Sequence, residues 1–156
     1  MAKIFETSDD IVELIEKQFS DTGLESYGLN LKIMSVPKAK DVIKVSRANA
    51  TTEHLTKTND LITVFVYEAA FDRLPDEAKE MITEMYLSGV SFDSEKDKIT
   101  LDTNPIHLIL NMRRKYGDDI LNKIELAVLV MEEIEEEEKE RKEAEKEAKR
   151  MKKNNK

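Results

Sequence analysis

The stretch LITVFVYEAAFDRLPDEAKEMITEMYLSGV, residues 61–90, predicts a buried strand followed closely by a short amphipathic helix. The first seven residues, through Tyr67, are mostly β-branched or aromatic, which favours a strand. Their almost unbroken apolar character indicates burial on both faces and therefore a central position in a sheet. Pro75 then stands at a helix entry, acidic side chains follow in the first turn, and Gly89 can end the helix.

Shorter patterns on either side of this stretch alternate between helical spacing and strand-like alternation. The other predicted elements of the body are a helix at 7–19, strands at 29–36 and 42–45, a polar loop or weak hairpin up to residue 60, a hairpin with its turn at 93–97, and a helix at 105–116. The sequence therefore predicts an α+β fold with a small mixed or antiparallel sheet of about four strands, packed by helices.

The last segment, from Asp118 onward, predicts one long helix whose character changes along its length. Apolar residues recur at helical spacing as far as Ile134 and then stop. Residues 132–140 hold seven Glu and one Lys, and residues 141–156 hold three Glu and eight Lys or Arg, an order that suits the helix dipole. We therefore expect an α+β domain at 1–117 and an apolar-then-charged helix at 118–156.

Composition excludes several classes of site. The chain has no cysteine and only two histidines, so thiolate sites are excluded and histidine metal sites are hard to build. A net charge of −8 argues against direct nucleic-acid binding, which needs clustered cations. The first ten residues lack a signal-peptide pattern and no run approaches membrane-spanning length, so we expect a cytoplasmic protein with no cofactor and no membrane partner.

The order of features from Val42 to Gly117 is similar to that of phage and prophage metallopeptidases with a minimal zincin-like fold. The pieces that carry the resemblance are DLITVFVYEAAFDRL, PDEAKEMITEMYLSGV, SFDSEKDKITLD and PIHLILNMRRKYG. In that family the helix after the aromatic-rich strand carries His-Glu-x-x-His. The resemblance covers about three-quarters of the chain and implies a zincin-like body.

The metal motif of that family is absent here. The resemblance places Met85 at the first ligand, Tyr86 at the catalytic glutamate and Gly89 at the second ligand. Zinc needs imidazole or carboxylate donors, and hydrolysis needs a general base beside the bound water. Since methionine, tyrosine and glycine supply neither, these are degenerate motif positions, and we predict no catalytic residue and no metal ligand.

Four further side chains have ordinary structural interpretations. Glu80 and Glu84 are spaced i, i+4 and could chelate a hard cation, but such pairs on a surface helix are more often solvated. His54 lies in the predicted polar loop and should be exposed. His107 lies on an apolar helix and should be a partly buried packing residue.

Two short charged motifs also resemble binding sites. DSEKDK, residues 93–98, lacks the glycine and the final glutamate of a calcium loop, so an acidic turn is the better interpretation. NMRRKYG, residues 111–117, could contact phosphate or an acidic partner. It is equally the pattern of a basic last helical turn closed by glycine, which we favour.

The C-terminal helix carries the strongest sign of a partner. Around KIELAVLVMEEI it is apolar nearly all round, and such a helix must be covered on several sides. The predicted partner-binding residues are Leu126, Leu129, Val130, Met131 and Ile134. The partner would be a phage structural protein, a host protein or a second copy of the chain.

The leading hypothesis is a non-catalytic, phage-type accessory or virion-associated protein that acts by protein–protein binding through its body and C-terminal helix. It would work in the host cytoplasm or in the virion. One alternative is a hydrolase with a non-standard metal site that uses Glu84 and His107. The other is an acidic regulator of a basic nucleic-acid-binding partner, whose complex would be sensitive to salt.

Overall fold

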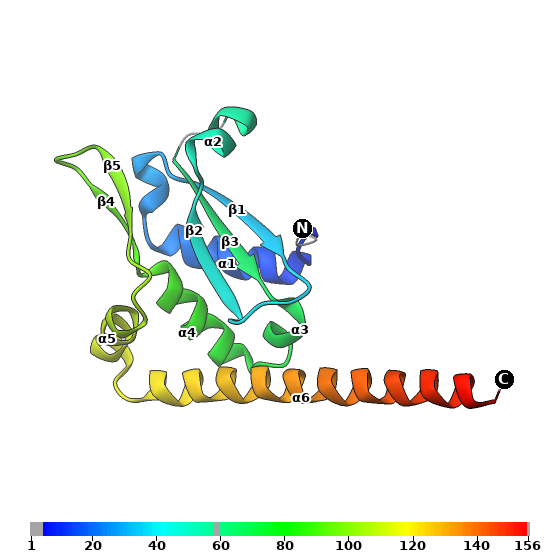
Figure 1. Cartoon of the computed structure of the whole chain (residues 1–156). Coiled ribbons are helices and arrows are strands. Elements are labelled where there is room, and N and C mark those ends of the chain that lie inside the picture. Colours follow the sequence, from blue (N-terminus) through cyan, green and yellow to red (C-terminus); the bar gives the residue numbers. More distant parts are fainter. Residues whose placement is uncertain (1–4, 58–59, 156) are drawn as a thin grey trace.

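The computed structural model describes residues 5–57 and 60–155 and confirms the α+β class (Figure 1). Strands β1, β2 and β3 form a three-stranded sheet, and β4 and β5 form a separate hairpin. In chain order the elements are α1 (Asp9–Asp21), the 3₁₀ turn η1 (Leu24–Tyr27), β1 (Asn30–Ser35), β2 (Ile43–Arg47), α2 (Ala50–Thr56), β3 (Leu61–Val66), α3 (Glu68–Phe71), α4 (Asp76–Leu87), β4 (Val90–Asp93), β5 (Lys98–Leu101), α5 (Pro105–Tyr116) and α6 (Asp119–Asn154).

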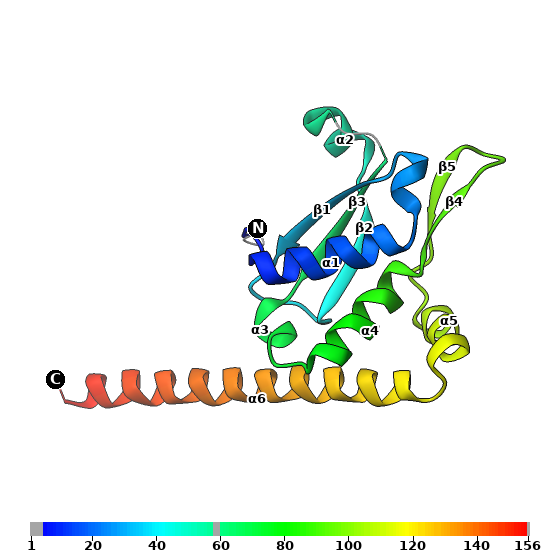
Figure 2. The same cartoon turned by 180° about the vertical axis from the view of Figure 1, so that it is seen from behind.

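The sheet is mixed, with the apolar strand β3 in its centre, as the sequence predicts. β3 runs parallel to β1 and antiparallel to β2, so β1 and β2 are the two edges. On one face Ile62, Val64 and Val66 are fully buried and join the core cluster that includes residues of α1 and α4. Seen from behind, α1 crosses this face, while no helix lies over the opposite face (Figures 1 and 2).

The segment between β2 and β3 differs from the prediction of a loop or weak hairpin. It forms the seven-residue helix α2, because the side chain of Asn49 accepts a hydrogen bond from the backbone N–H of Thr52 at 2.8 Å and caps the helix start. No residue of α2 is buried. Its β-branched, polar sequence carries no apolar face, so helical periodicity could not reveal it.

Helix α4 contributes side chains to both hydrophobic clusters of the protein. Ala78 and Ile82 pack into the main core beneath the sheet. Met81 and Met85 pack on another side into a second cluster with Leu108 of α5, together with Met112 and Ile120. The hairpin β4–β5 then extends from the end of α4 as a separate sheet. The five strands therefore form a three-stranded sheet and a two-stranded hairpin, where the sequence predicts one sheet of about four strands.

Helix α6 runs past the body as one continuous rod that projects well beyond it (Figures 1 and 2). Its first part belongs to the body, because Ile120 and Ile134 are buried there, whereas every residue from Lys139 to Asn155 is exposed. The beginning of α6 therefore packs against residues of the predicted domain at 1–117. Among the described residues no helix combines the length and the apolar character that crossing a lipid bilayer requires.

Candidate functional site

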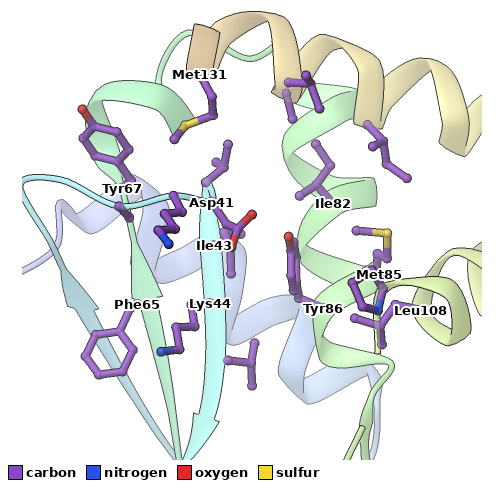
Figure 3. Close-up of a pocket in the computed structure, with 18 of the residues that line it drawn as sticks. Asp41, Ile43, Lys44, Phe65, Tyr67, Ile82, Met85, Tyr86, Leu108 and Met131 are labelled. Carbon is purple, nitrogen blue, oxygen red and sulfur yellow. The ribbon is translucent and has the colours of Figure 1, made fainter. Parts of the chain in front are cut away.

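A cleft of about 1200 Å³ lies beside the edge strand β2 in the described structure. The loop between β1 and β2 and strand β2 form one wall, α4 and α5 form the opposite wall, and the first half of α6 crosses one end. Figure 3 shows Met131 of α6 and Tyr86 of α4 reaching into the space beside Ile43 of β2. The cleft thus joins the predicted body to the predicted C-terminal helix.

Most of the cleft lining is apolar. Its apolar side chains come from elements that are far apart in the sequence, and they are Val36, Ala39, Val42, Ile43, Val45, Phe65, Tyr67, Ile82, Met85, Tyr86, Leu101, Pro105, Leu108, Ile109, Ile124, Ala127, Val128, Met131 and Ile134. Charged groups stand at the rim, where Lys38 Nζ lies 2.9 Å from a carboxylate oxygen of Glu138. This ion pair links the β1–β2 loop to α6 across one end of the cleft.

The free edge of β2 adds backbone hydrogen-bonding groups to this wall. The carbonyl of Val42 accepts from the Tyr67 N–H and the Ala48 N–H donates to the Leu61 carbonyl, both at 2.9 Å. In an antiparallel pair, residues whose backbone groups bond to the partner strand alternate with residues whose backbone groups do not. The backbone N–H and C=O groups of the even-numbered residues of β2 therefore point toward β3. The backbone N–H and C=O groups of Ile43 and Val45 therefore point away from β3, and both residues line the cleft.

Tyr86 is a partly buried polar group between these walls. Burial is the main cause that raises its pKa to about 12, and the negative charge of Asp41 on the β1–β2 loop adds to the effect. Figure 3 shows the Tyr86 hydroxyl and the Asp41 side chain near each other, on opposite walls of the cleft. A phenol with such a pKa stays neutral at pH 7, so Tyr86 can donate a hydrogen bond but cannot act as a general base there.

The other two positions compared with a zinc motif have structural explanations. Met85 is buried in the cluster between α4, α5 and α6. Helix α4 ends at Leu87, so Gly89 lies beyond it and does not share a helical face with Met85. A Cβ atom on Gly89 would lie 2.0 Å from the carbonyl oxygen of Asp102, so close backbone packing requires glycine here.

The acidic pair on α4 does not form a common site. Glu80 is exposed, whereas Glu84 is only partly exposed and accepts hydrogen bonds at 2.5 Å from Lys115 Nζ and the Tyr116 hydroxyl. These bonds are the main cause that raises the pKa of both Lys115 and Tyr116. The basic end of α5 thus pairs with α4, in addition to lying in the last helical turn. Glu84 therefore links two helices and is not simply solvated.

The two histidines lie apart from these groups. His107 is exposed, which contradicts the prediction of a packing residue, because α5 turns Leu108 and not His107 toward the core. Its Nδ1 lies 2.7 Å from a carboxylate oxygen of Asp102. The hydrogen bond from the Asn104 N–H is the main cause that holds the pKa of Asp102 below its usual range, and the hydrogen bond with His107 adds to it. His54 is exposed as predicted, although on α2 rather than in a loop.

The predicted partner-binding residues of α6 divide into two groups. Ile134 is buried against the body, and Val130 and Met131 are partly buried against the same core. Leu126 and Leu129 remain exposed. Val128, which is not among the predicted partner-binding residues, is exposed to the same degree as Leu129 but lines the cleft. Helical spacing already separates the two, since Val128 lies on the apolar face that runs through Ile124, Met131 and Ile134 and Leu129 lies off it.

The cleft is equipped for binding. It offers apolar surface, unpaired strand-edge groups and a neutral tyrosine hydroxyl, which together suit an extended peptide segment. Within residues 5–57 and 60–155 no group of three or more His, Asp or Glu side chains is placed to hold a metal ion. Comparison of the chain with family models, with curated proteins and with solved structures finds no match.

Proposed function

We propose that this protein is a non-catalytic binding protein whose cleft between β2 and the helices α4, α5 and α6 takes up a segment of a partner protein. The observation that carries the proposal is the combination of an apolar cleft of about 1200 Å³ with the free backbone edge of β2 along one wall. An extended segment could add its backbone to β2 while alternate side chains enter the apolar wall. Such binding needs neither a metal nor a catalytic base.

The resemblance to phage metallopeptidases extends this proposal. A zincin-like body without the zinc-binding residues would retain a place for a polypeptide and lose the hydrolysis. The protein would then be a phage-type accessory factor, virion-associated or host-directed, with a phage structural protein or a host protein as its partner. The exposed second half of α6 would extend its reach without contributing to the cleft.

Two neighbouring substitutions test the proposal. Val128 and Leu129 are 49% and 48% exposed on the same helix, but only Val128 lines the cleft. Peptides would first be selected from a random library against the wild-type chain, and their affinities measured by fluorescence polarisation. Val128→Lys should weaken the selected peptides at least tenfold, because a charged side chain would enter the apolar wall. Leu129→Lys should leave them unchanged.

These two variants also distinguish binding in the cleft from binding on the outer face of α6. If Leu129→Lys weakens binding and Val128→Lys does not, the partner binds the outer face of the helix and the cleft is not the site. A selection that yields no peptide binding better than 100 µM, an affinity near the weak end of specific recognition, would contradict the proposal. Thermal unfolding of both variants shows whether each retains the fold.

A further inference from the structure

The uncovered face of the three-stranded sheet has a composition unlike the rest of the molecule. Since partners in register share a face, Lys32 lies beside Thr63 and Ser46, and Met34 lies beside Phe65 and Lys44. No helix lies over this face of the sheet (Figures 1 and 2), although Thr63 on the central strand is buried. Lys32 and Lys44 are exposed, Phe65 and Met34 are partly exposed, and no acidic residue occupies this face of the strands.

The stretch of chain that contains β1 and β2 is more basic than the rest, although only Lys32 and Lys44 of its cations lie on this face of the strands and Arg47 is in register with Ile62 on the other face. Residues 28–57 contain six Lys or Arg and two Asp or Glu, a net charge of +4 within a chain of −8. The remainder of the chain therefore carries −12. The overall acidity reflects other regions, above all the seven glutamates at 132–140, and it hides a local basic surface.

Several of these cations have no internal partner. Lys38 pairs with Glu138, and Arg47 donates to the carbonyl oxygen of Ile99 at 3.2 Å. By contrast, none of the ion pairs found in the described part of the chain includes Lys32, Lys40 or Lys44. Unpaired cations around an accessible aromatic ring favour an anionic ligand that also has flat faces.

The register of the three strands fixes how far the lysines of this face lie from Phe65. Lys44 and Met34 stand one strand away on either side of Phe65, about 4.8 Å across the sheet. Lys32 and Thr63 lie one row further along, about 7 Å away in the strand direction. Figure 3 shows the Lys44 side chain extended across β3 toward Phe65, where this face meets the rim of the cleft. A ring on the central strand thus has cations on two sides.

We propose that this sheet face and the adjoining β1–β2 loop bind a short stretch of single-stranded nucleic acid, with a base stacked on Phe65 and phosphates contacting Lys32 and Lys44 on the strands and Lys40 on the loop, which lines the same cleft as Lys44 and Phe65. The aromatic side chain favours this occupant over an acidic protein segment, because an acidic segment would use the lysines and leave the ring without a role. The inference goes beyond the proposed function in its class of partner, although Lys40, Lys44 and Phe65 also line the cleft.

The test measures the binding of a fluorescein-labelled ten-nucleotide oligothymidine to the full chain by fluorescence anisotropy. At 20 mM salt the wild type should bind, and log K should fall with log salt at a slope of about −2, since each of three neutralised phosphates contributes about −0.7. Lys44→Gln should reduce that slope by about 0.7. Phe65→Ala should weaken binding at least fivefold, as loss of one stacked base predicts, and should leave the slope unchanged.

Lys17→Gln is the matched control, because Lys17 is an exposed lysine on α1, which covers the opposite face. It should bind like the wild type, and circular dichroism should show all variants folded. The absence of saturable binding at 20 mM salt would overturn the proposal. So would an equal loss in Lys17→Gln. If Phe65→Ala has no effect and polyglutamate displaces the oligonucleotide at equal charge, the face belongs to an acidic polypeptide instead.

Discussion

The carbonyl oxygen of Asp102 lies 2.0 Å from the position that a Cβ atom would occupy on Gly89. The Asp102 N–H also donates to the Gly89 carbonyl at 2.8 Å, so the two backbones are in direct contact where β4 begins and β5 ends. Leu108 Cδ2 lies 2.9 Å from the same Cβ position. The end of α4, the hairpin and the start of α5 are therefore joined at one residue that has no side chain.

Gly89→Ala should destabilise the fold by roughly 1–3 kcal/mol or more, because the Asp102 backbone or the Leu108 side chain must move to admit the methyl group. Urea unfolding followed by circular dichroism measures the loss. Ser94→Ala, in the exposed hairpin turn, is the control and should change the free energy of unfolding by less than about 0.5 kcal/mol. Equal stability of the two variants would show that the contact relaxes without cost.

Glu84→Gln should cost about 1–2 kcal/mol, because it weakens the charge-assisted bonds from Lys115 and Tyr116 that join α4 to α5. Glu80→Gln removes the same charge one turn earlier, where the side chain is exposed, and should be nearly neutral. The comparison uses urea unfolding at low and high salt. A loss in Glu84→Gln that 1 M salt does not reduce would argue against an electrostatic contribution.

The raised pKa of Tyr86 predicts a loss of stability at alkaline pH. The neutral phenol is the protonated form, and the folded state holds its proton up to a pKa of about 12, whereas the unfolded chain releases it near 10. Below pH 10 both states are protonated and this group contributes no pH dependence. Between pH 10 and 12 the unfolded state ionises first, so stability falls by about 1.4 kcal/mol per pH unit.

Tyr86→Phe should remove that part of the alkaline loss and leave the contributions of other groups in place. The measurement is the free energy of unfolding of both proteins in urea at pH 8, 9, 10 and 11. The two curves should run parallel up to pH 10 and then diverge, with the wild type falling more steeply. Parallel curves up to pH 11 would show that Tyr86 titrates like an exposed tyrosine.

Local patterns were sufficient for the elements that bury an apolar stripe. The run through Tyr67 predicts the central strand β3, and the spacing from Ala78 to Met85 predicts α4. The short helix α2 could not be found this way, because it is stabilised by the cap of Asn49 and buries nothing. The exposure of His107 and the cleft position of Val128 depend on how α5 and α6 are oriented against the body, which periodicity alone does not specify.

The first half of α6 should contribute to folding and its second half should not. Ile134→Ala removes a side chain that is 7% exposed and should cost about 2–4 kcal/mol, whereas Leu129→Ala on the exposed side should cost less than about 0.5 kcal/mol. Truncation after Glu140 deletes a segment that is exposed through Asn155, so the free energy of unfolding should stay within about 0.5 kcal/mol of the wild type.

Truncation after Asp119 deletes both buried positions of α6, Ile120 and Ile134, and uncovers the core beneath them. Cooperative unfolding should then be lost, because the second core cluster loses Ile120 and one wall of the cleft disappears. Differential scanning calorimetry of the two truncated chains distinguishes the outcomes. If the chain cut after Asp119 unfolds with the wild-type enthalpy, residues 1–117 form an independent domain and α6 is an appendage along its whole length.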